Sequence, residues 1–424
     1  MRVLFTVWPM SAHLYPVVPL AWALQGAGHE VRVASHPALT DTVTAAGLNA
    51  VPLADADTMP PLSAVGRFMT GDEERDRLAE ALAVGPGDED PWQMFSDYAL
   101  AALRIFHTSD DPSTLAPGVE QLVDVARSWR PDLVLWDQWP AAAVAARLCG
   151  AAQARTLWGP DYCGWARARF LERGGAQALG LEDPLVQVVR PIAEHYGLAV
   201  DEELLLGQWS VDPTPAAMRL RTGARTVAVR RVPYTGVGAV PGWLHRAPER
   251  PRLALSLGMS GRLFHNNAAM IADMLETVGG LDADVVATLN SAQLAGQRVP
   301  DNVRTVDYLP LNQLLPTCSA IIHHGGGGTL SAAVAHRVPQ LILRGEGVEG
   351  AAYARYLTDR GAGLTLDHKA QSKDEMRARI RRVLREPQFR VGADTLHADW
   401  LSTPSPHDIV PVLEGLTARY RDRK

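Results

Sequence analysis

The chain has 424 residues, of which 47% are hydrophobic and 21% are charged, and its formal net charge is −6. This length exceeds what one ordinary hydrophobic core serves, so we expect two domains. The slight acidity and the scattered basic residues exclude nucleic-acid binding as the main function. Three widely separated cysteines, Cys149, Cys163 and Cys318, predict reduced thiols, a cytoplasmic location and no structural zinc site. No apolar run of about 18 residues occurs, so no membrane span is expected.

The first half of the chain alternates predicted strands and helices. Residues 3–7 are a predicted strand rather than a signal peptide, because the apolar run is short. A loop through His13 follows, and we expect a helix to begin near Pro16. Further strands are predicted at 31–34, 51–53, 132–136 and 154–157, and a helix at 140–148. Repeated strand–helix units predict a parallel sheet with right-handed crossovers.

Between residues 55 and 130 this alternation gives way to amphipathic helices, such as 92–106, separated by acidic and glycine- and proline-rich loops. The insert is too long for a simple connection, so we expect it to cover a site or to dock a partner. A proline- and glycine-rich linker is predicted to follow. The predicted parts are an N-terminal domain (1–235), the linker (236–251), a C-terminal domain (252–404), and a last helix within 405–424 that packs back on the N-terminal domain.

The second half contains a glycine-rich segment, Ile321-Ile322-His323-His324-Gly325-Gly326-Gly327-Gly328-Thr329. A helix that starts just after these glycines offers unpaired backbone N–H groups and the positive end of its dipole to an anion. Thr329 adds a hydroxyl and His324 adds a donor of adjustable charge. We therefore predict a phosphate site. The alternatives are a glycine-rich turn without a ligand and, for His324, a core histidine bonded to the backbone.

Other phosphate-binding loops do not match this segment. A Walker loop needs Gly-Lys-Ser/Thr, and no lysine follows these glycines. The dinucleotide fingerprint lies in the first strand–helix turn of its domain, whereas this segment follows several strands of the second half. The strands predicted in the second half are 253–257, 285–288, 303–306 and 320–323, which precede the glycines, and 341–343, which follows them.

Taken in order, the motifs of the chain resemble those of the family 1 glycosyltransferases with the GT-B fold. The C-terminal motifs are Leu257-Gly258-Met259-Ser260-Gly261-Arg262, Tyr308-Leu309-Pro310 and the glycine segment. The N-terminal phrases at 19–22, 28–33, 129–136 and 157–161 are similar to the actinomycete branch that transfers deoxysugars to macrolides and polyketides, a branch of the activator-dependent type. The resemblance covers nearly the whole chain.

This resemblance implies an α/β fold with two Rossmann-like βαβ domains that face each other across a cleft. The C-terminal domain would hold a dTDP-sugar donor and the N-terminal domain a hydrophobic aglycone. Sugar transfer to an acceptor hydroxyl would invert the anomeric centre without a metal or cofactor. The residues implied to bind the nucleotide sugar are Gly258, Ser260, Arg262, Tyr308, Leu309, His324, Gly326, Gly327, Gly328, Thr329 and Glu349.

Tyr308 and Glu349 are expected to contact opposite ends of the nucleotide sugar. The resemblance implies that Tyr308 stacks under the base. The family usually has Asp followed by Gln where this chain has Glu349-Gly350. A carboxylate there would bind sugar hydroxyls, and the missing Gln side chain would suit a deoxygenated sugar. An acidic residue near a helix N-terminus, stabilised by the dipole alone, is the alternative for Glu349.

His13 and Asp137 are the predicted catalytic residues. Each follows a predicted strand, and the carboxyl ends of parallel strands form the active edge of such a sheet. A histidine there can accept the proton that an acceptor hydroxyl loses as it attacks. A carboxylate bonded to the imidazole would fix its tautomer and stabilise the imidazolium. The family carries a His-Asp pair at these two places, whereas a loop histidine taken alone is more often a surface group.

Several interpretations stay open. A sugar-nucleotide epimerase of the same fold, or a non-catalytic nucleotide-binding subunit, would share most of these motifs. The resemblance also implies a cytochrome-like auxiliary activator protein as a partner, and it leaves open a homodimer. Trp8, Trp136, Trp139 and Trp158 are candidates for an apolar acceptor pocket, with core packing as the alternative.

Overall fold

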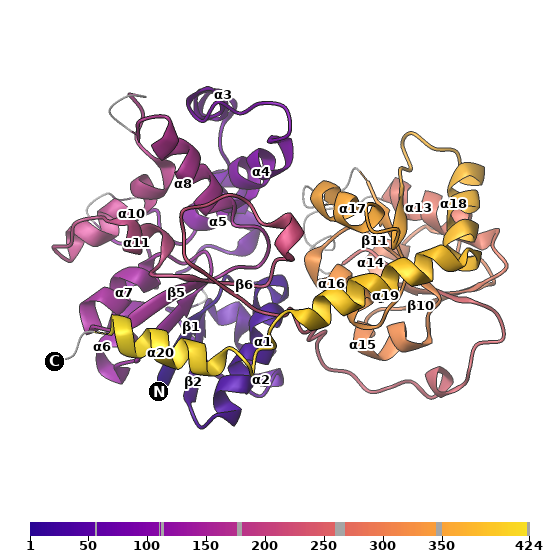
Figure 1. The fold of residues 1–424 in the computed structure, drawn as a ribbon, viewed down its shortest axis with the longest axis horizontal. Coiled ribbons are helices and arrows are strands. Elements are labelled where there is room, and N and C mark those ends of the chain that lie inside the picture. The colour runs from indigo at the N-terminus through magenta and orange to yellow at the C-terminus, as the bar shows by residue number, and fades with distance from the viewer. Residues whose placement is uncertain are drawn as a thin grey trace. The chain divides into compact units, whose positions relative to one another are not determined.

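The computed structural model describes residues 1–55, 57–109, 111, 114–175, 180–258, 268–344 and 350–421. The chain divides into two compact units, coloured mainly indigo to magenta and orange in Figure 1. The first unit comprises Met1–Arg230 and Pro404–Lys424, and the second comprises Arg231–Thr403. The predicted linker at 236–251 lies within the second unit, where Gln313 donates a hydrogen bond to the Gly238 carbonyl.

The first unit is built on a seven-stranded sheet in the order β3-β2-β1-β4-β5-β6-β7, in which all neighbouring strands are parallel. The predicted parallel sheet is confirmed. β6 and β7 are additional to the predicted strands. The strands are β1 (Arg2–Thr6), β2 (Glu30–Ser35), β3 (Asn49–Pro52), β4 (Leu133–Trp136), β5 (Ala152–Thr156), β6 (Ser210–Asp212) and β7 (Thr226–Ala228).

The centre of this sheet is buried on both faces, which explains its continuous apolar strands. Val3, Leu4 and Phe5 of β1 are fully buried, as is all of β4. The chain adds β2 and β3 on one side of β1 and β4 to β7 on the other. The carboxyl ends of β1 and β4 therefore form the topological switch point, where ligands bind in open α/β sheets.

The first helix, α1 (Ser11–Gly26), begins earlier than predicted and includes His13. The expected loop through His13 is wrong: its N–H and that of Leu14 both bond to the Met10 carbonyl and close a helical turn. Pro16 lies inside the helix rather than at its start. A proline removes only one N–H, and the turn before it is already hydrogen-bonded, so the helix continues through it.

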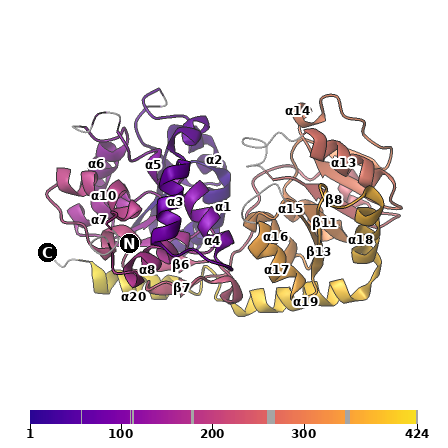
Figure 2. The same ribbon diagram turned by 90° about the horizontal axis from the view of Figure 1, so that it is seen from above.

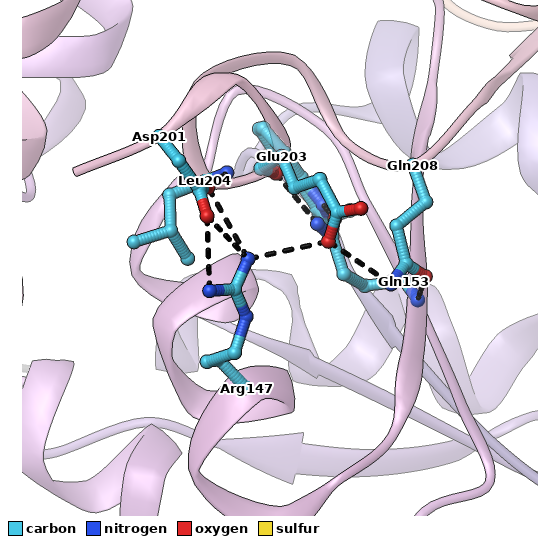
Figure 3. A network of polar contacts seen from close by, with 7 residues as sticks. Arg147, Gln153, Asp201, Glu203, Leu204 and Gln208 are labelled. Carbon is cyan, nitrogen blue, oxygen red and sulfur yellow. Dashed lines mark hydrogen bonds and ion pairs between the residues drawn. The ribbon is translucent and has the colours of Figure 1, made fainter. Parts of the chain in front are cut away.

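Other helices cover the sheet of the first unit (Figure 1). They are η1 (Pro37–Leu39), α2 (Thr40–Ala45), α6 (Val119–Trp129), α7 (Ala141–Cys149), α8 (Tyr162–Glu172), α10 (Pro184–His195), α11 (Glu202–Leu206), η4 (Ala216–Met218) and α20 (Val410–Tyr420). Figure 3 shows one connection: the Arg147 guanidinium of α7 lies between the carboxylates of Asp201 and Glu203. Gln153 of β5 donates to the Glu203 carbonyl and accepts from the Trp136 indole at the end of β4.

The predicted insert consists of short helical segments that pack beside α8 at one end of the unit (Figure 1). These are η2 (Leu62–Phe68), α3 (Asp72–Ala81), α4 (Glu89–Gln93), a π-helical segment η3 (Met94–Ala99) and α5 (Leu100–Arg104). One continuous helix was predicted over 92–106. The structure instead changes hydrogen-bonding register within it, because the π-helical turn accommodates an extra residue.

The second unit has a six-stranded parallel sheet in the order β10-β9-β8-β11-β12-β13. Its strands are β8 (Arg252–Ser256), β9 (Asp284–Thr288), β10 (Val303–Val306), β11 (Ala320–His323), β12 (Gln340–Leu343) and β13 (Gly363–Leu366). Buried apolar side chains pack on both faces of this sheet. β11 lies at the centre, so the glycine segment that follows it also starts at the carboxyl edge of a sheet.

The helices around this second sheet are η5 (Gly242–His245), α13 (Ala268–Gly279), α14 (Ser291–Leu294), α15 (Leu311–Leu314), η6 (Leu315–Thr317), α16 (Gly327–Ala335), α17 (Gly350–Thr358), α18 (Lys373–Arg385) and α19 (Pro387–Ser402). Figure 2 shows α19 and α20 in succession at the end of the chain. No helix in the described part of the chain is long and apolar enough to cross a membrane.

Candidate functional site

His13 and Asp137 lie together at the switch point of the first sheet. His13 Nδ1 is 2.5 Å from Asp137 Oδ2, and both side chains are 2% exposed. The Asp137 N–H donates to the carbonyl of Thr6, the last residue of β1, at 2.9 Å. This bond places the carboxylate beside the turn that carries His13. Because the Asp137 carboxylate accepts the Nδ1 proton, the other ring nitrogen, Nε2, is the basic one.

The other ring nitrogen of His13 contacts a residue that the sequence did not single out. His13 Nε2 is 2.8 Å from the Tyr98 hydroxyl, which belongs to the π-helical segment. The rings of Trp8 and Trp158 lie 5.2 and 5.4 Å from the imidazole, between ring centroids. His13 is therefore enclosed by three aromatic residues and a carboxylate. The sequence signal for Tyr98 was weak, because it is one aromatic residue within a helical insert.

A cavity of about 50 Å³ adjoins Asp137. Trp136, Trp158 and Tyr162 contribute rings to its wall, together with the polar residues Gln138 and Thr156. This volume is well below the roughly 300–1,000 Å³ of typical ligand pockets. Of the four tryptophans considered for an acceptor pocket, Trp8, Trp136 and Trp139 are at most 2% exposed and belong to the core, whereas Trp158 is half-buried.

A buried ion pair fixes the loop that carries Trp158. The Arg155 guanidinium contacts both Asp161 carboxylate oxygens, at 2.7 and 2.5 Å, and also donates to the Leu206 carbonyl. Asp161 in turn accepts from the Gly164 N–H at the start of α8. Burial, reinforced by the nearby Asp161 charge, raises the pKa of the Cys163 thiol to about 12. Cys163 is therefore a neutral thiol and an unsuitable nucleophile.

The glycine segment of the second unit is shaped by a lack of space for side chains. Gly325 has φ +93°, and a Cβ atom there would lie 2.8 Å from the Gly350 Cα. A Cβ on Gly326 would lie 2.4 Å from His324 Nε2, and one on Gly327 would lie 2.7 Å from the Tyr353 hydroxyl. Only glycine fits these three positions without displacement of a neighbour. Gly328 is exposed and has no such neighbour within 4 Å.

The helix α16 starts inside the glycine segment, at Gly327, and its first turn carries no side-chain cap. Its N-terminal N–H groups and dipole therefore make it suited to bind an anion. Thr329 lies in this first turn and is 8% exposed. Gly258, which follows β8 and has φ +77°, lies so close to His324 that a Cβ there would be 2.2 Å from the imidazole Cε1. The structure thus brings Gly258, His324 and the glycines together.

His323 supports this segment from within the core. It is fully buried, its Nδ1 accepts a hydrogen bond from the Gly325 N–H at 3.1 Å, and its Nε2 lies 2.9 Å from the Gln340 Oε1. Burial and the neighbouring His324 lower the pKa of His323 to about 3. The neutral ring therefore holds Gly325 in its positive-φ conformation. The two adjacent histidines thus lie in different environments: His323 supports the backbone from the core, whereas His324 lies beside Gly258 and Gly326. A function was predicted only for His324.

The remaining predicted nucleotide-sugar residues divide into two groups. Tyr308 is 39% exposed, and its hydroxyl donates to the Thr235 carbonyl. The Leu309 side chain is 4% exposed and packs in the core of the second unit. Ser260, Arg262 and Glu349 lie outside the described residues. Within the described part of the chain, no group of three or more His, Cys, Asp or Glu residues could hold a metal ion.

Comparison with known families decides the class of the protein. Residues 22–258 match the N-terminal domain model of the erythromycin biosynthesis protein CIII-like family, and residues 272–416 match the C-terminal domain model of the same family. The chain belongs to this family. The predicted relationship to the GT-B macrolide and polyketide deoxysugar transferases is thereby confirmed.

Relatives of this CIII-like chain are glycosyltransferases. It is 40% identical to a 3-alpha-mycarosylerythronolide B desosaminyl transferase of Saccharopolyspora erythraea, over 100% of both chains. It is 42% identical to a 10-deoxymethynolide desosaminyltransferase of Streptomyces venezuelae, over 99% of this chain and 98% of the relative. The CIII-like chain is accordingly a glycosyltransferase, as predicted.

Solved structures of similar proteins support the fold. The spinosyn forosaminyltransferase SpnP superposes with a TM-score of 0.80 at 36% identity, covering 99% of both chains. The glycosyltransferase VinC in complex with dTDP superposes with a TM-score of 0.82 at 34% identity, covering 99% of this chain and 100% of that chain. The predicted GT-B fold of this CIII-like protein is confirmed.

Proposed function

We propose that this glycosyltransferase moves a deoxysugar from a dTDP-sugar to a hydroxyl group of a macrolide- or polyketide-type aglycone, with inversion at the anomeric carbon. The observation that carries the proposal is the 2.5 Å contact between His13 Nδ1 and Asp137 Oδ2 at the switch point of the first sheet. A buried imidazole with a fixed tautomer is suited to take the proton of an attacking hydroxyl. Relatives named for the transfer of amino- and deoxysugars support the substrate class.

In the first unit, His13 acts as the general base and Asp137 orients it. The acceptor hydroxyl is a poor nucleophile until its proton leaves as the new bond forms. The carboxylate stabilises the imidazolium that results, because the two groups are only 2% exposed and solvent does not screen their attraction. A general base of this kind contributes about 10²–10⁴-fold in rate.

In the second unit, the glycine segment binds the diphosphate that leaves. The N-terminal N–H groups of α16 and the hydroxyl of Thr329 face charge that grows on the diphosphate as the sugar departs. His324 adds a donor beside Gly258 and Gly326. Tyr308 and Leu309 are proposed to contact the base, and Ser260, Arg262 and Glu349 the phosphates and sugar. A binding titration tests these contacts separately: dTDP compared with UDP tests recognition of the nucleobase, and dTDP compared with TMP tests recognition of the diphosphate.

The decisive experiment measures release of dTDP from dTDP-desosamine with 10-deoxymethynolide, tylactone or aklavinone as the aglycone. The wild type is expected to release dTDP only when a suitable aglycone is present, and His13→Ala is expected to lose this activity while it still binds dTDP. Interconversion of the dTDP-sugar without any aglycone would contradict the proposal and indicate an epimerase. Binding of dTDP without turnover of any donor–acceptor pair would indicate a non-catalytic subunit.

We also propose that an auxiliary protein binds the first unit at its helical insert. Arg169 of α8 contacts Asp88 of the insert, which joins these two parts of the surface. The side chains of Met69 and Leu171, one from each part, are both 50% exposed. Stimulation of turnover by a cytochrome-like protein encoded beside this gene, and loss of that stimulation in Met69→Lys, is the expected result. Full activity of the purified chain alone would contradict this partner.

A further inference from the structure

The general base has no direct route to solvent at its basic nitrogen. His13 is 2% exposed, its Nδ1 contacts Asp137, and its Nε2 contacts the Tyr98 hydroxyl at 2.8 Å. Tyr98 itself is half-buried, so the phenol is the more accessible group. A substrate hydroxyl therefore reaches the position at Nε2 only through Tyr98 or after Tyr98 has moved.

The direction of the hydrogen bond follows from the tautomer. The Asp137 carboxylate has no proton to give, so the Nδ1–H of His13 donates to it and Nε2 is an acceptor. The Tyr98 hydroxyl consequently donates its proton to Nε2. A phenol oxygen can accept a hydrogen bond while it donates one, so a hydroxyl that approaches Tyr98 Oη can donate to it.

Tyr98 is held in place by the segment that carries it. Phe95, Ser96 and Ala99 of η3 are at most 1% exposed. The Thr70 hydroxyl donates to the Ser96 carbonyl at 2.7 Å, and the Trp8 indole donates to the Ala102 carbonyl at 3.0 Å. The first bond fixes η3 itself, and the second fixes α5, which continues directly from it. Backbone movement of this pair of segments would break these bonds and uncover apolar side chains, which is costly.

The phenol ring is held as well. The ring of Trp158 lies edge-on to Tyr98 at 5.4 Å between centroids, and that of Trp8 lies edge-on at 6.0 Å. Trp158 is in turn on the loop fixed by the Arg155–Asp161 ion pair. π-Helical segments are frequent at functional sites because the extra residue redirects a side chain. In this chain, the redirected side chain is the one that contacts the base.

We propose that Tyr98 is a catalytic residue that relays the acceptor's proton to His13. This inference rests on the proposed function, in which His13 is the general base. A fixed phenol between the accessible surface and Nε2 connects the two groups without uncovering the imidazole. The aromatic rings around the relay also exclude water, which strengthens the interaction between the imidazolium and Asp137.

The proposed step is balanced in protons and electrons. The acceptor oxygen forms a bond to the anomeric carbon while the bond from that carbon to the diphosphate oxygen breaks, and its electron pair leaves with dTDP. The acceptor's proton passes to Tyr98 Oη, and the original Tyr98 proton passes to His13 Nε2. Tyr98 is again a neutral phenol at the end of the step, and His13 is an imidazolium paired with Asp137.

The test compares Tyr98→Phe with Tyr196→Phe in single-turnover reactions of dTDP-desosamine and whichever of the three aglycones the wild type uses. Tyr196 is a half-buried tyrosine beyond the end of α10 and is a matched control for loss of a phenol hydroxyl. Tyr98→Phe is expected to lower the rate of the chemical step by about 10²-fold or more, with little change in acceptor KM. The control variant is expected to keep the wild-type rate.

The number of protons transferred in the chemical step distinguishes a relay through Tyr98 from a Tyr98 that only positions His13. We expect the rate of the wild type to fall non-linearly with the fraction of D₂O in the solvent, because two protons move in one step. The remaining activity of Tyr98→Phe should depend linearly on that fraction. A linear dependence in both proteins would overturn the relay, as only a positioning effect would remain.

A Tyr98→Phe variant as fast as the wild type, or faster, would also overturn the proposal, and would show that the phenol covers the base and moves aside. His13→Ala distinguishes this failure from failure of the proposed function. If His13→Ala is inactive and Tyr98→Phe is fully active, His13 remains the base and only the relay is wrong. If His13→Ala retains near-normal transfer, both proposals fail.

Discussion

The two proposed halves of the site are built in different ways. In the first unit, side chains define it: Asp137 and Tyr98 contact the two nitrogens of His13. In the second unit, the backbone defines it: Gly325, Gly326 and Gly327 leave no space for a Cβ atom. A proton needs a partner with one fixed direction, whereas a diphosphate can be bound by several amides that point outward together. The first half should therefore be sensitive to changes of chemical group, and the second to changes of shape.

The largest effect is expected from Asp137→Asn, a change of charge without a change of shape. An amide can donate to Nδ1 and so favour the wrong tautomer, and it cannot stabilise the imidazolium. We expect kcat to fall by roughly 10³-fold or more, with dTDP affinity unchanged. Asp124→Asn, on the exposed face of α6, is the control. A loss below about tenfold would show that the carboxylate does not orient the base.

A change of pH should affect the stability of the second unit, where the glycine backbone forms the site, through His323. The pKa of this residue is lowered to about 3. The unfolded chain binds this proton near pH 6.5, so the unfolded state holds more protons between pH 6.5 and 3. The stabilising effect of the neutral ring is complete above pH 6.5 and is lost as the pH falls. We expect a loss of about 3 kcal/mol between pH 6.5 and 4. Urea unfolding of the second unit at several pH values measures it.

The variant His323→Gln should make this loss less steep, although it also reduces stability at neutral pH. A second buried histidine, His107 in the first unit, has its pKa lowered to about 4 by burial. His107 Nδ1 lies 2.6 Å from the Leu103 carbonyl, and no glycine N–H in the described part of the chain bonds to this ring. Acid should therefore weaken dTDP binding through His323 and not through His107. Equal effects of His323→Gln and His107→Gln on the affinity for dTDP would contradict this distinction.

A smaller effect is expected from Gly325→Ala, a change of shape without a change of charge. The positive φ costs an alanine about 1–2 kcal/mol, and the close approach of the Gly350 Cα adds to this. Gly415→Ala is the control, because this exposed glycine lies inside α20 of the first unit, its Cβ would meet nothing within 4 Å, and alanine favours a helix by up to about 1 kcal/mol. Thermal unfolding with and without dTDP should show destabilisation and weaker binding in the first variant alone.

The smallest effect is expected at the network of Figure 3. The Arg147 side chain is 32% exposed, and its carboxylate partners are more exposed. Ion pairs of this kind contribute below about 1 kcal/mol. Arg147→Ala should therefore lower the midpoint of urea unfolding slightly and leave kcat unchanged. A large loss of kcat would mean that the ends of β4 and β5 depend on this network for their positions.

The parts of the molecule that the sequence predicted well are those with a strong periodic signal. The buried strands at the centre of each sheet have continuous apolar runs, and their order placed His13 and Asp137 at neighbouring strand ends. The three-residue strands β6 and β7 lack such a run. The helix α19 was missed because Pro387, at its first position, resembles a signal for the end of α18.

The site was predictable only where chemistry follows from chain position. The glycine segment is recognisable from the sequence, since four consecutive glycines have few structural uses other than to let another group approach the backbone closely. Tyr98 gave no such signal, because a π-helical turn depends on packing around it rather than on a local pattern. The helix start at Ser11 was also hidden, because Pro16 favoured a later beginning. The structural role of His323 could not be predicted, because it depends on hydrogen bonds with Gln340 and Gly325, and only the fold brings Gln340 to it.

The last helix has a consequence for the order in which the protein is made. α20 belongs to the first unit, where Leu413 and Leu416 are buried and Glu414 lies 2.9 Å from His29. On the ribosome, all of the second unit is synthesised before this helix. Folding of the first unit therefore cannot be completed until the whole second unit has emerged, and until then the surface that α20 covers stays exposed. Premature termination after α19 would accordingly leave the first unit, rather than the second, incompletely folded and open to chaperones and proteases.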